Sequence, residues 1–258
     1  MTSLLPSLTD LRATCQPESL VGRVNAEHWA GRLYMRRVSL HLTRQLVRTP
    51  LSADAVTWLM IASGLLAAAA LTLPGLAAAA AAVVLVQAQL LFDCSDGEVA
   101  RWRGTSSPVG VYLDRIGHYS TEAGMVAALG VRASGGWDSL DGWTTWALVA
   151  AVLTLMVKSE TDLVHTARAY AGLPLLEDKG SAPRGSRSRS MRQALRYIPF
   201  YRALIAIELS FLALLAAIGD SVFGDLSGTR LLVAVLAPLA AVVAAGHLYS
   251  ILASDRLR

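Results

Sequence analysis

The residues best suited to chemistry lie in one polar stretch that follows a long apolar run. The end of the run carries a group that shares one helix face, at spacings i, i+3, i+4 and i+7: Asp93, Asp96, Gly97 and Ala100, with Arg101 directly after it. A short loop later, a second face carries residues at i, i+4 and i+8: Asp114, His118 and Glu122. Acidic side chains at the end of an apolar helix are costly to keep there, so we take them as candidates for function.

Two helices joined by a short loop would turn these two faces toward each other. The result is a polar pocket of carboxylates with an imidazole and an arginine. Oxygen-rich sites suit Mg²⁺ or Mn²⁺, and these cations in turn bind phosphate groups. The small side chains at Gly97 and Ala100 would let a ligand approach the helix backbone.

The elements that must position this site are apolar helices. Of the 258 residues, 54% are apolar and 16% are charged, whereas soluble domains carry about 25% charged residues. Five uncharged or nearly uncharged runs predict membrane spans at residues 55–73, 75–92, 143–157, 203–219 and 231–254, and the run 110–131, with its charged residues, predicts another. A span needs about 20 residues, so some of these helices must extend through their polar flanks. We therefore expect an all-α integral membrane protein with six transmembrane helices.

The basic residues predict the orientation of these spans. With six spans, 18 of the 23 Lys and Arg residues fall on the side that holds both termini and the polar site. That side is expected to be cytoplasmic. The net charge of +4 then reflects this distribution, and we expect no nucleic-acid partner. The two cysteines, Cys15 and Cys94, fit neither a zinc site nor a disulfide scaffold.

Two cytoplasmic segments are expected outside the spans. Residues 30–48 predict an amphipathic helix on the membrane surface, or alternatively a soluble cap helix, with apolar residues near one face: Leu33, Val38, Leu42, Leu46 and Val47. Residues 1–52 would thus form a cytoplasmic N-terminal segment before a transmembrane domain at 53–258. The loop 177–192 is rich in Gly, Ser and Arg and is expected to be a flexible linker. Its neighbouring arginines would either bind phosphate or anionic headgroups or simply mark the cytoplasmic side: Arg184, Arg187, Arg189, Arg192 and Arg196.

The spacing of the polar motif resembles the signature of the CDP-alcohol phosphotransferase (CDP-alcohol phosphatidyltransferase) family. Seven of its eight fixed positions match: Asp93, Asp96, Gly97, Ala100, Arg101, Gly110 and Asp114. His118 stands where the family has a fourth Asp. Thr49-Pro50 followed by Thr57 also resembles the family's TPNxxT motif, with Leu51 in place of the Asn. The resemblance extends over residues 30–255 through the predicted helices, but only residues 49–118 carry specific motifs.

The resemblance implies a reaction and a set of ligands. An acceptor hydroxyl would attack the β-phosphate of a CDP-linked donor, CMP would leave, and a phosphodiester would form. Asp93, Asp96 and Asp114 would hold two divalent cations that bridge the diphosphate. The CDP site would be lined by the other motif positions and the first span: Thr57, Gly97, Ala100, Arg101 and Gly110. The resemblance further implies a homodimer and phospholipid synthesis as the common reaction. Because the pocket is expected at the membrane surface, we expect a lipid as donor or acceptor. His118 and the Arg-rich loop leave room for a sugar, inositol or polyol acceptor, or for a small CDP-alcohol donor.

His118 leaves several roles open. An imidazole titrates near neutral pH, with a pKa of about 6.5, so it suits a general base better than a carboxylate does. Glu122, one turn later, would orient its other nitrogen. Alternatively, His118 is a ligand for Mn²⁺, has a structural role, or marks an inactive CDP-binding relative. A transporter would explain the intramembrane charges but not the seven matching positions.

A second polar group follows the fourth predicted span and suggests an acceptor site. Lys158, Asp162 and His165 share one helix face, and Arg168 lies one turn beyond His165. Arg202 stands at the start of the fifth span. Charged groups at this depth must face a partner or water rather than lipid. They would bind a polar or phosphorylated acceptor, or they would pair with one another.

Overall fold

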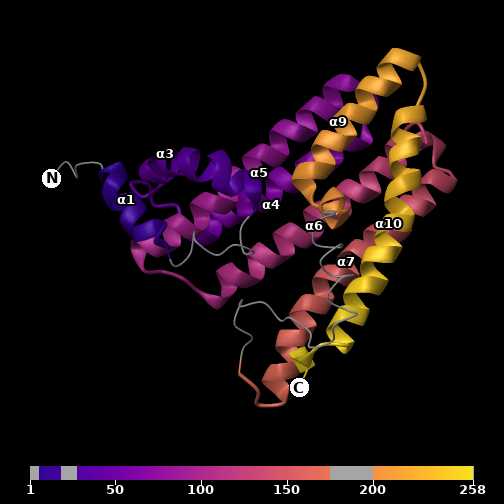
Figure 1. Ribbon diagram of the computed structural model, residues 1–258. Helices are drawn as coiled ribbons and strands as arrows, with labels where there is room; N and C mark the ends of the chain where they lie inside the picture. Colours follow the sequence, from indigo (N-terminus) through magenta and orange to yellow (C-terminus); the bar gives the residue numbers. More distant parts are fainter. Residues whose placement is uncertain (1–5, 19–27, 175–199, 258) are drawn as a thin grey trace. The chain divides into compact units, whose positions relative to one another are not determined.

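The computed structural model describes residues 6–18, 28–174 and 200–257, and helices are the only regular secondary structure among these residues (Figure 1). The principal helices are α1 (Leu8–Cys15), η1 (Gly31–Met35), α3 (Arg36–Leu46), α4 (Ala53–Thr72), α5 (Leu76–Arg103), α6 (Pro108–Ala133), α7 (Gly142–Tyr170), η3 (Phe200–Leu204), α9 (Ala206–Phe223) and α10 (Ser227–Leu252). Short helical turns, η2 (Trp137–Ser139) and η4 (Asp255–Leu257), complete the list. The expected all-helical fold is confirmed. The basic loop 177–192 and the arginines at 184–196 lie outside the described residues.

Within the described part of the chain, four helices are long enough and apolar enough to cross a membrane: α4, α5, α9 and α10. They indicate an integral membrane protein. The other two expected spans, α6 and α7, have 26 and 29 residues, but α6 carries charged side chains along its length and α7 carries them in its second half, from Lys158 onward. The arrangement of six spans with both termini in the cytoplasm stays a prediction.

The chain forms two compact units. The first unit comprises Met1–Ala67 and Val84–Thr121, and the second comprises Ala68–Val83 and Glu122–Arg258. Helices α4, α5 and α6 pass from one unit to the other. Residues after position 52 contribute to both units, so the functional boundary expected between residues 52 and 53 stays a prediction.

In the first unit, apolar clusters join the surrounding helices to α5 and α6. One cluster joins α3, α4 and α5 through Leu46, Ala53, Val56 and Val99. Another joins α1 and α3 through Leu11, Cys15 and Leu40, with Trp102 of α5 packed against it. A third joins α4 and α6 through Met60, Ile61 and Leu113. These contacts fix the helices that carry the polar motif.

Helices α4 and α6 approach each other closely at two glycines. A Cβ atom on Gly117 would overlap the side chain of Met60, and one on Gly64 would overlap the side chain of Thr121. Because side chains larger than hydrogen would separate the helices, these glycines set the distance of α6 from α4. They thereby place the turns of α6 that carry Asp114 and His118.

The helix expected at residues 30–48 is present as η1 and α3, and it buries against the protein a face that the sequence did not single out. Its most buried side chains are Met35, Ser39, Leu40, Thr43 and Leu46, whereas Leu33 and Val38 are 64% and 48% exposed. Hydroxyl groups occupy the buried face because a carboxylate of α5 lies beneath them, as described below. Tyr34 in η1 adds a hydrogen bond of 2.5 Å from its hydroxyl to Gln87 Oε1 of α5. A position on the membrane surface stays a prediction for this helix.

In the second unit, α10 packs along α7 and against α9 (Figure 1). A buried guanidinium fixes one end of this unit. Arg132 of α6 is 1% exposed and donates to the carbonyl oxygens of Leu73 at 2.8 Å and Gly75 at 3.0 Å. Its Nε also donates to Thr229 Oγ1 at 3.3 Å, and the backbone N–H of Thr229 donates to Asp220 at 3.0 Å. Arg132 therefore links the carbonyl groups after α4 to the first turn of α10.

The change Arg132→Ala should lower the free energy of unfolding by about 3 kcal/mol, because it leaves buried polar groups without their partner. Thermal unfolding of the purified protein in detergent, followed by tryptophan fluorescence, measures the effect. Arg37→Ala, which removes an exposed arginine of α3, serves as the control. Equal melting temperatures for the two variants would contradict the assigned role of Arg132.

Candidate functional site

The site is built on the end of α5, where three carboxylates follow one another within six residues: Asp93, Asp96 and Glu98. A carboxylate in an apolar setting needs hydrogen-bond or charge partners to offset the loss of water. In the first unit, each of the three finds its partner on a different neighbouring element.

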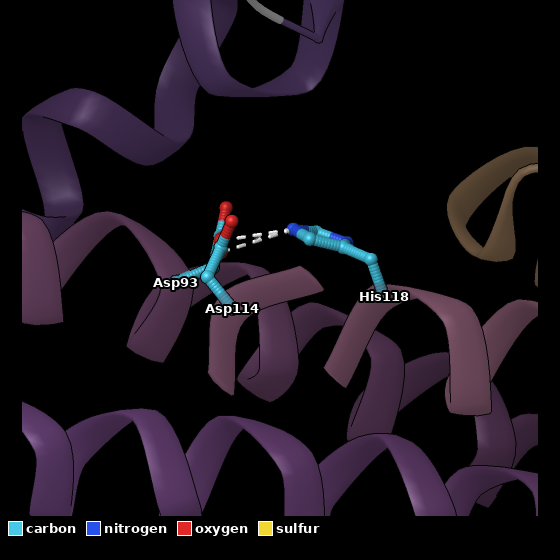
Figure 2. Close-up of side chains that lie close together, drawn as sticks. All are labelled: Asp93, Asp114 and His118. Atoms are coloured by element: carbon cyan, nitrogen blue, oxygen red, sulfur yellow. Dashed lines mark hydrogen bonds and ion pairs between the residues drawn. The ribbon is translucent and has the colours of Figure 1, made fainter. Parts of the chain in front are cut away.

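Asp93 is brought together with two residues of α6, as the spacing predicted. His118 Nε2 lies 3.1 Å from Asp93 Oδ1 and 3.5 Å from Asp114 Oδ1 (Figure 2). One ligand atom from each residue lies within 4.8 Å of the others. The three side chains are 25%, 40% and 36% exposed for Asp93, Asp114 and His118. The group is therefore open to solvent on one side, unlike a carboxylate used only to hold helices together.

Asp96 lies deeper and faces α4. It is 8% exposed, and Thr57 Oγ1 donates to its Oδ2 at 2.7 Å. The backbone N–H of Gly97 donates to its other oxygen. Thr57 is thus in contact with a carboxylate of the motif. Asp96 does not belong to the three-residue group of Figure 2.

In this structure, neighbouring side chains lie close to the motif glycines. A Cβ atom on Gly97 would lie 2.9 Å from Arg101 Nη1, so the guanidinium lies over the space that the sequence assigned to a ligand. Arg101 Nε donates to the carbonyl oxygen of Cys15 at 2.6 Å. Ala100 packs partly buried against the cluster of α3, α4 and α5. A Cβ atom on Gly110 would lie 3.3 Å from Asp54 Oδ1, a carboxylate that the sequence did not single out.

Glu98 is the main residue that sequence reasoning missed. It is fully buried, and its Oε1 accepts hydrogen bonds from Ser39 Oγ at 2.6 Å and Gln16 Nε2 at 2.7 Å. Its Oε2 accepts from Thr43 Oγ1 at 2.7 Å, and Arg36 Nη1 lies 3.8 Å from Oε1. The signal for this site was the pair of hydroxyl residues at positions 39 and 43, which share a helix face.

Glu122 belongs to the second unit and has a partner there. Its side chain is 4% exposed, and Lys158 Nζ of α7 lies 2.8 Å from its Oε1. A buried carboxylate paired with an ammonium group is fully accounted for as a contact between α6 and α7. The role of Glu122 in orienting His118 stays a prediction.

The residues expected to bind the acceptor lie in the second unit and differ in burial and in hydrogen-bond partners. Arg168 is 7% exposed and donates to the carbonyl oxygens of Pro174 at 2.9 Å and Arg256 at 2.8 Å, which is a structural use of its guanidinium. His165 has a buried Nδ1 without a hydrogen-bond partner among the described residues. Asp162 and Arg202 are half-buried. Their joint action with Lys158 on an acceptor stays a prediction.

The donor atoms of the open group fit a divalent cation. Two carboxylate oxygens and an imidazole nitrogen within 4.8 Å of one another can turn toward a common centre. Oxygen ligands suit Mg²⁺ and Mn²⁺, and a nitrogen ligand favours Mn²⁺ over Mg²⁺. Asp93, Asp114 and His118 thus form a possible metal-binding cluster.

Comparison with known families places this geometry in context. The family model for CDP-alcohol phosphatidyltransferase matches residues 51–179, half of the chain. The matched range contains the complete motif from Asp93 to His118, and the family generally uses divalent metals. No match was found among the curated proteins. On the strength of this match, the chain belongs to the CDP-alcohol phosphatidyltransferase family.

Proposed function

We propose that this protein transfers a substituted phosphate from a CDP-linked donor to a hydroxyl acceptor and releases CMP. The observation that carries the proposal is the convergence of Asp93, Asp114 and His118, three motif positions from two helices, to within 4.8 Å. All three side chains remain a quarter or more exposed, so a ligand can reach their donor atoms. Buried Glu98 shows how this chain partners a carboxylate that only holds helices together.

The donor side of the site rests on the carboxylates and on Arg101. Asp93, Asp96 and Asp114 would hold two divalent cations, Mg²⁺ or Mn²⁺. When bound, the cations would neutralise the charge of the diphosphate and of the departing CMP. Arg101, fixed at its Nε by a carbonyl oxygen, would offer its terminal nitrogens to the same diphosphate. Thr57 would hold Asp96 in place.

His118 would act as the general base. Its Nε2 would take the proton of the acceptor hydroxyl as the hydroxyl oxygen bonds to the β-phosphorus. The bond from that phosphorus to the bridging oxygen breaks, and CMP leaves with that oxygen. His118 then holds the proton until water removes it. The proposal is supported by the position of Nε2 beside Asp93 and Asp114, the carboxylates that would hold the cations, because a base must lie within hydrogen-bond reach of the attacking hydroxyl.

The substrates and the setting follow from the helix that carries the site. The carboxylates lie at the end of a helix apolar enough to span a membrane, so the donor or the acceptor would carry a lipid tail at the membrane surface. The acceptor side would use polar residues of the second unit: Lys158, Asp162, His165, Arg168 and Arg202. The distribution of basic residues supports a cytoplasmic site in a protein of six spans. Homodimer formation belongs to the same proposal.

The change His118→Ala should lower the rate of CMP release by about 100-fold or more, the usual loss when a general base is removed, while donor binding is retained. His118→Asp, which restores the residue common in the family, should retain most of the activity. The assay measures CMP release from purified protein with candidate CDP donors, acceptors and Mn²⁺, with donor binding measured separately by calorimetry. His41→Ala, an exposed histidine of α3, is the matched control.

Full CMP release by His118→Ala would refute the role of His118 as base. Donor binding without CMP release in the wild-type protein would instead support an inactive CDP-binding relative, for which the replacement of the fourth Asp by His118 is the motivating observation.

The change Asp93→Asn should abolish metal-dependent CMP release, because it removes a charged ligand from the cluster and leaves its size unchanged. Asp138→Asn, at an exposed aspartate of η2, should leave the rate unaltered. The rate of CMP release, measured for each protein over a range of Mn²⁺ concentrations, checks the effect. A wild-type rate with unchanged Mn²⁺ dependence in Asp93→Asn would show that the cluster is not the metal site.

A further inference from the structure

The N-terminal helix α1 lies before the range that matches the family, residues 51–179, yet it is bonded directly to the motif. Cys15 Sγ donates to the carbonyl oxygen of Glu98 at 3.3 Å, and Gln16 Nε2 donates to Glu98 Oε1 at 2.7 Å. In the other direction, Arg101 Nε donates to the carbonyl oxygen of Cys15 at 2.6 Å. Three bonds thus join the end of α1 to Arg101 of the motif and to Glu98, which lies between two motif residues.

Packing holds α1 in the same place. Leu11 and Cys15 are fully buried beside Leu40 of α3, and Trp102 packs against them. Arg44 Nε of α3 donates to the carbonyl oxygen of Pro6 at 2.9 Å. A helix of eight residues is too short to be stable in water by itself. The structure of α1 therefore depends on its contacts with α3 and α5.

The bond to Cys15 determines which atoms Arg101 can offer to a ligand. The last carbonyl groups of a helix lack partners within the helix and carry partial negative charge, so they attract a guanidinium. With Nε engaged there, the terminal nitrogens lie over Gly97 and have no hydrogen-bond partner among the described residues. A guanidinium held in this way presents two parallel N–H groups, an arrangement suited to phosphate oxygens.

We propose that the segment from Pro6 to Gln16 is a part of the donor site, and that it holds Arg101 in the orientation that binds the donor's diphosphate. Gln16 and Glu98 are positioning residues in this arrangement, since they act by fixing the end of α1. The inference rests on the proposed function for the identity of the ligand. It adds an element that the motif does not contain, because α1 precedes the matched range.

If the inference holds, docking of α1 and binding of the diphosphate must favour each other, since coupling between two binding events is reciprocal. Cys15 reports on docking. Burial, and secondarily the charge of Glu98, raise the pKa of its thiol to about 11, so little reactive thiolate is present at neutral pH. Alkylation therefore requires α1 to leave its place.

The test measures alkylation of Cys15 by N-ethylmaleimide in the full-length protein in detergent, resolved from Cys94 by peptide mass spectrometry. CDP with Mn²⁺ should slow labelling of Cys15 severalfold. Gln16→Leu, which loses a hydrogen bond to a charged group, should speed labelling and weaken CDP binding, each by about tenfold. It should raise KM for the donor and leave kcat and the acceptor KM near their wild-type values. Gln45→Leu, the same change at an exposed position of α3, should behave as wild type.

Arg101→Lys separates docking from ligand binding. Lysine keeps the charge but lacks the two parallel N–H groups of the guanidinium, so CDP should no longer protect Cys15 from alkylation. Equal labelling of the wild-type protein with and without CDP would overturn the inference, whether or not CMP is released. Faster labelling of Gln16→Leu with unaltered CDP affinity would overturn the inference as well. Protection by CDP without CMP release would support the inference and refute the proposed transfer, because protection does not require turnover.

Discussion

An acidic side chain at the end of an apolar helix must be given partners, and α5 carries three such side chains within six residues. In the first unit, these partners come from several neighbouring helices. Asp93 meets the imidazole on α6, Asp96 meets a threonine of α4, and Glu98 meets the hydroxyl groups of α3 and the amide that follows α1. One short segment thus supplies a polar attachment point for each neighbouring helix. The apolar clusters add packing around these points, but the carboxylates determine which face of each neighbour turns inward.

The three carboxylates differ in how completely their oxygens are used. Glu98 is fully buried, and both of its oxygens accept short hydrogen bonds, so a ligand from solvent cannot reach it. Asp96 is buried but is held by one hydroxyl and one backbone N–H. Asp93 is a quarter exposed and lies beside the imidazole of His118. Along α5, Asp93 is therefore a possible metal-binding residue, whereas Glu98 fixes the neighbouring helices. The positions of Asp93 and Asp96 depend on the contacts that Glu98 makes on the other side of the helix.

The sequence allowed the part of the site with helical spacing to be predicted. Spacing by three and four residues indicated that Asp93 and Asp114 would face each other with His118, and the apolar runs indicated the helices that carry them. It did not reveal the partners of Glu98, because Gln16 and Ser39 lie 82 and 59 residues away along the chain and no periodicity links them. The buried face of α3 was missed for a related reason: a buried carboxylate makes hydroxyl groups favourable where hydrophobicity alone predicts apolar side chains. The space over Gly97 was assigned to a ligand because the reach of the Arg101 side chain cannot be read from spacing.

The central claim is that the end of α5 binds a divalent cation and the diphosphate of a CDP-linked compound at one place. Electron paramagnetic resonance of Mn²⁺ bound to the purified protein, recorded with and without CDP, tests this claim most directly. The account predicts that CDP adds hyperfine coupling from phosphorus to the spectrum of bound Mn²⁺ and that Asp93→Asn removes the bound signal. A Mn²⁺ spectrum that does not respond to CDP, or one that persists unaltered in Asp93→Asn, would contradict it.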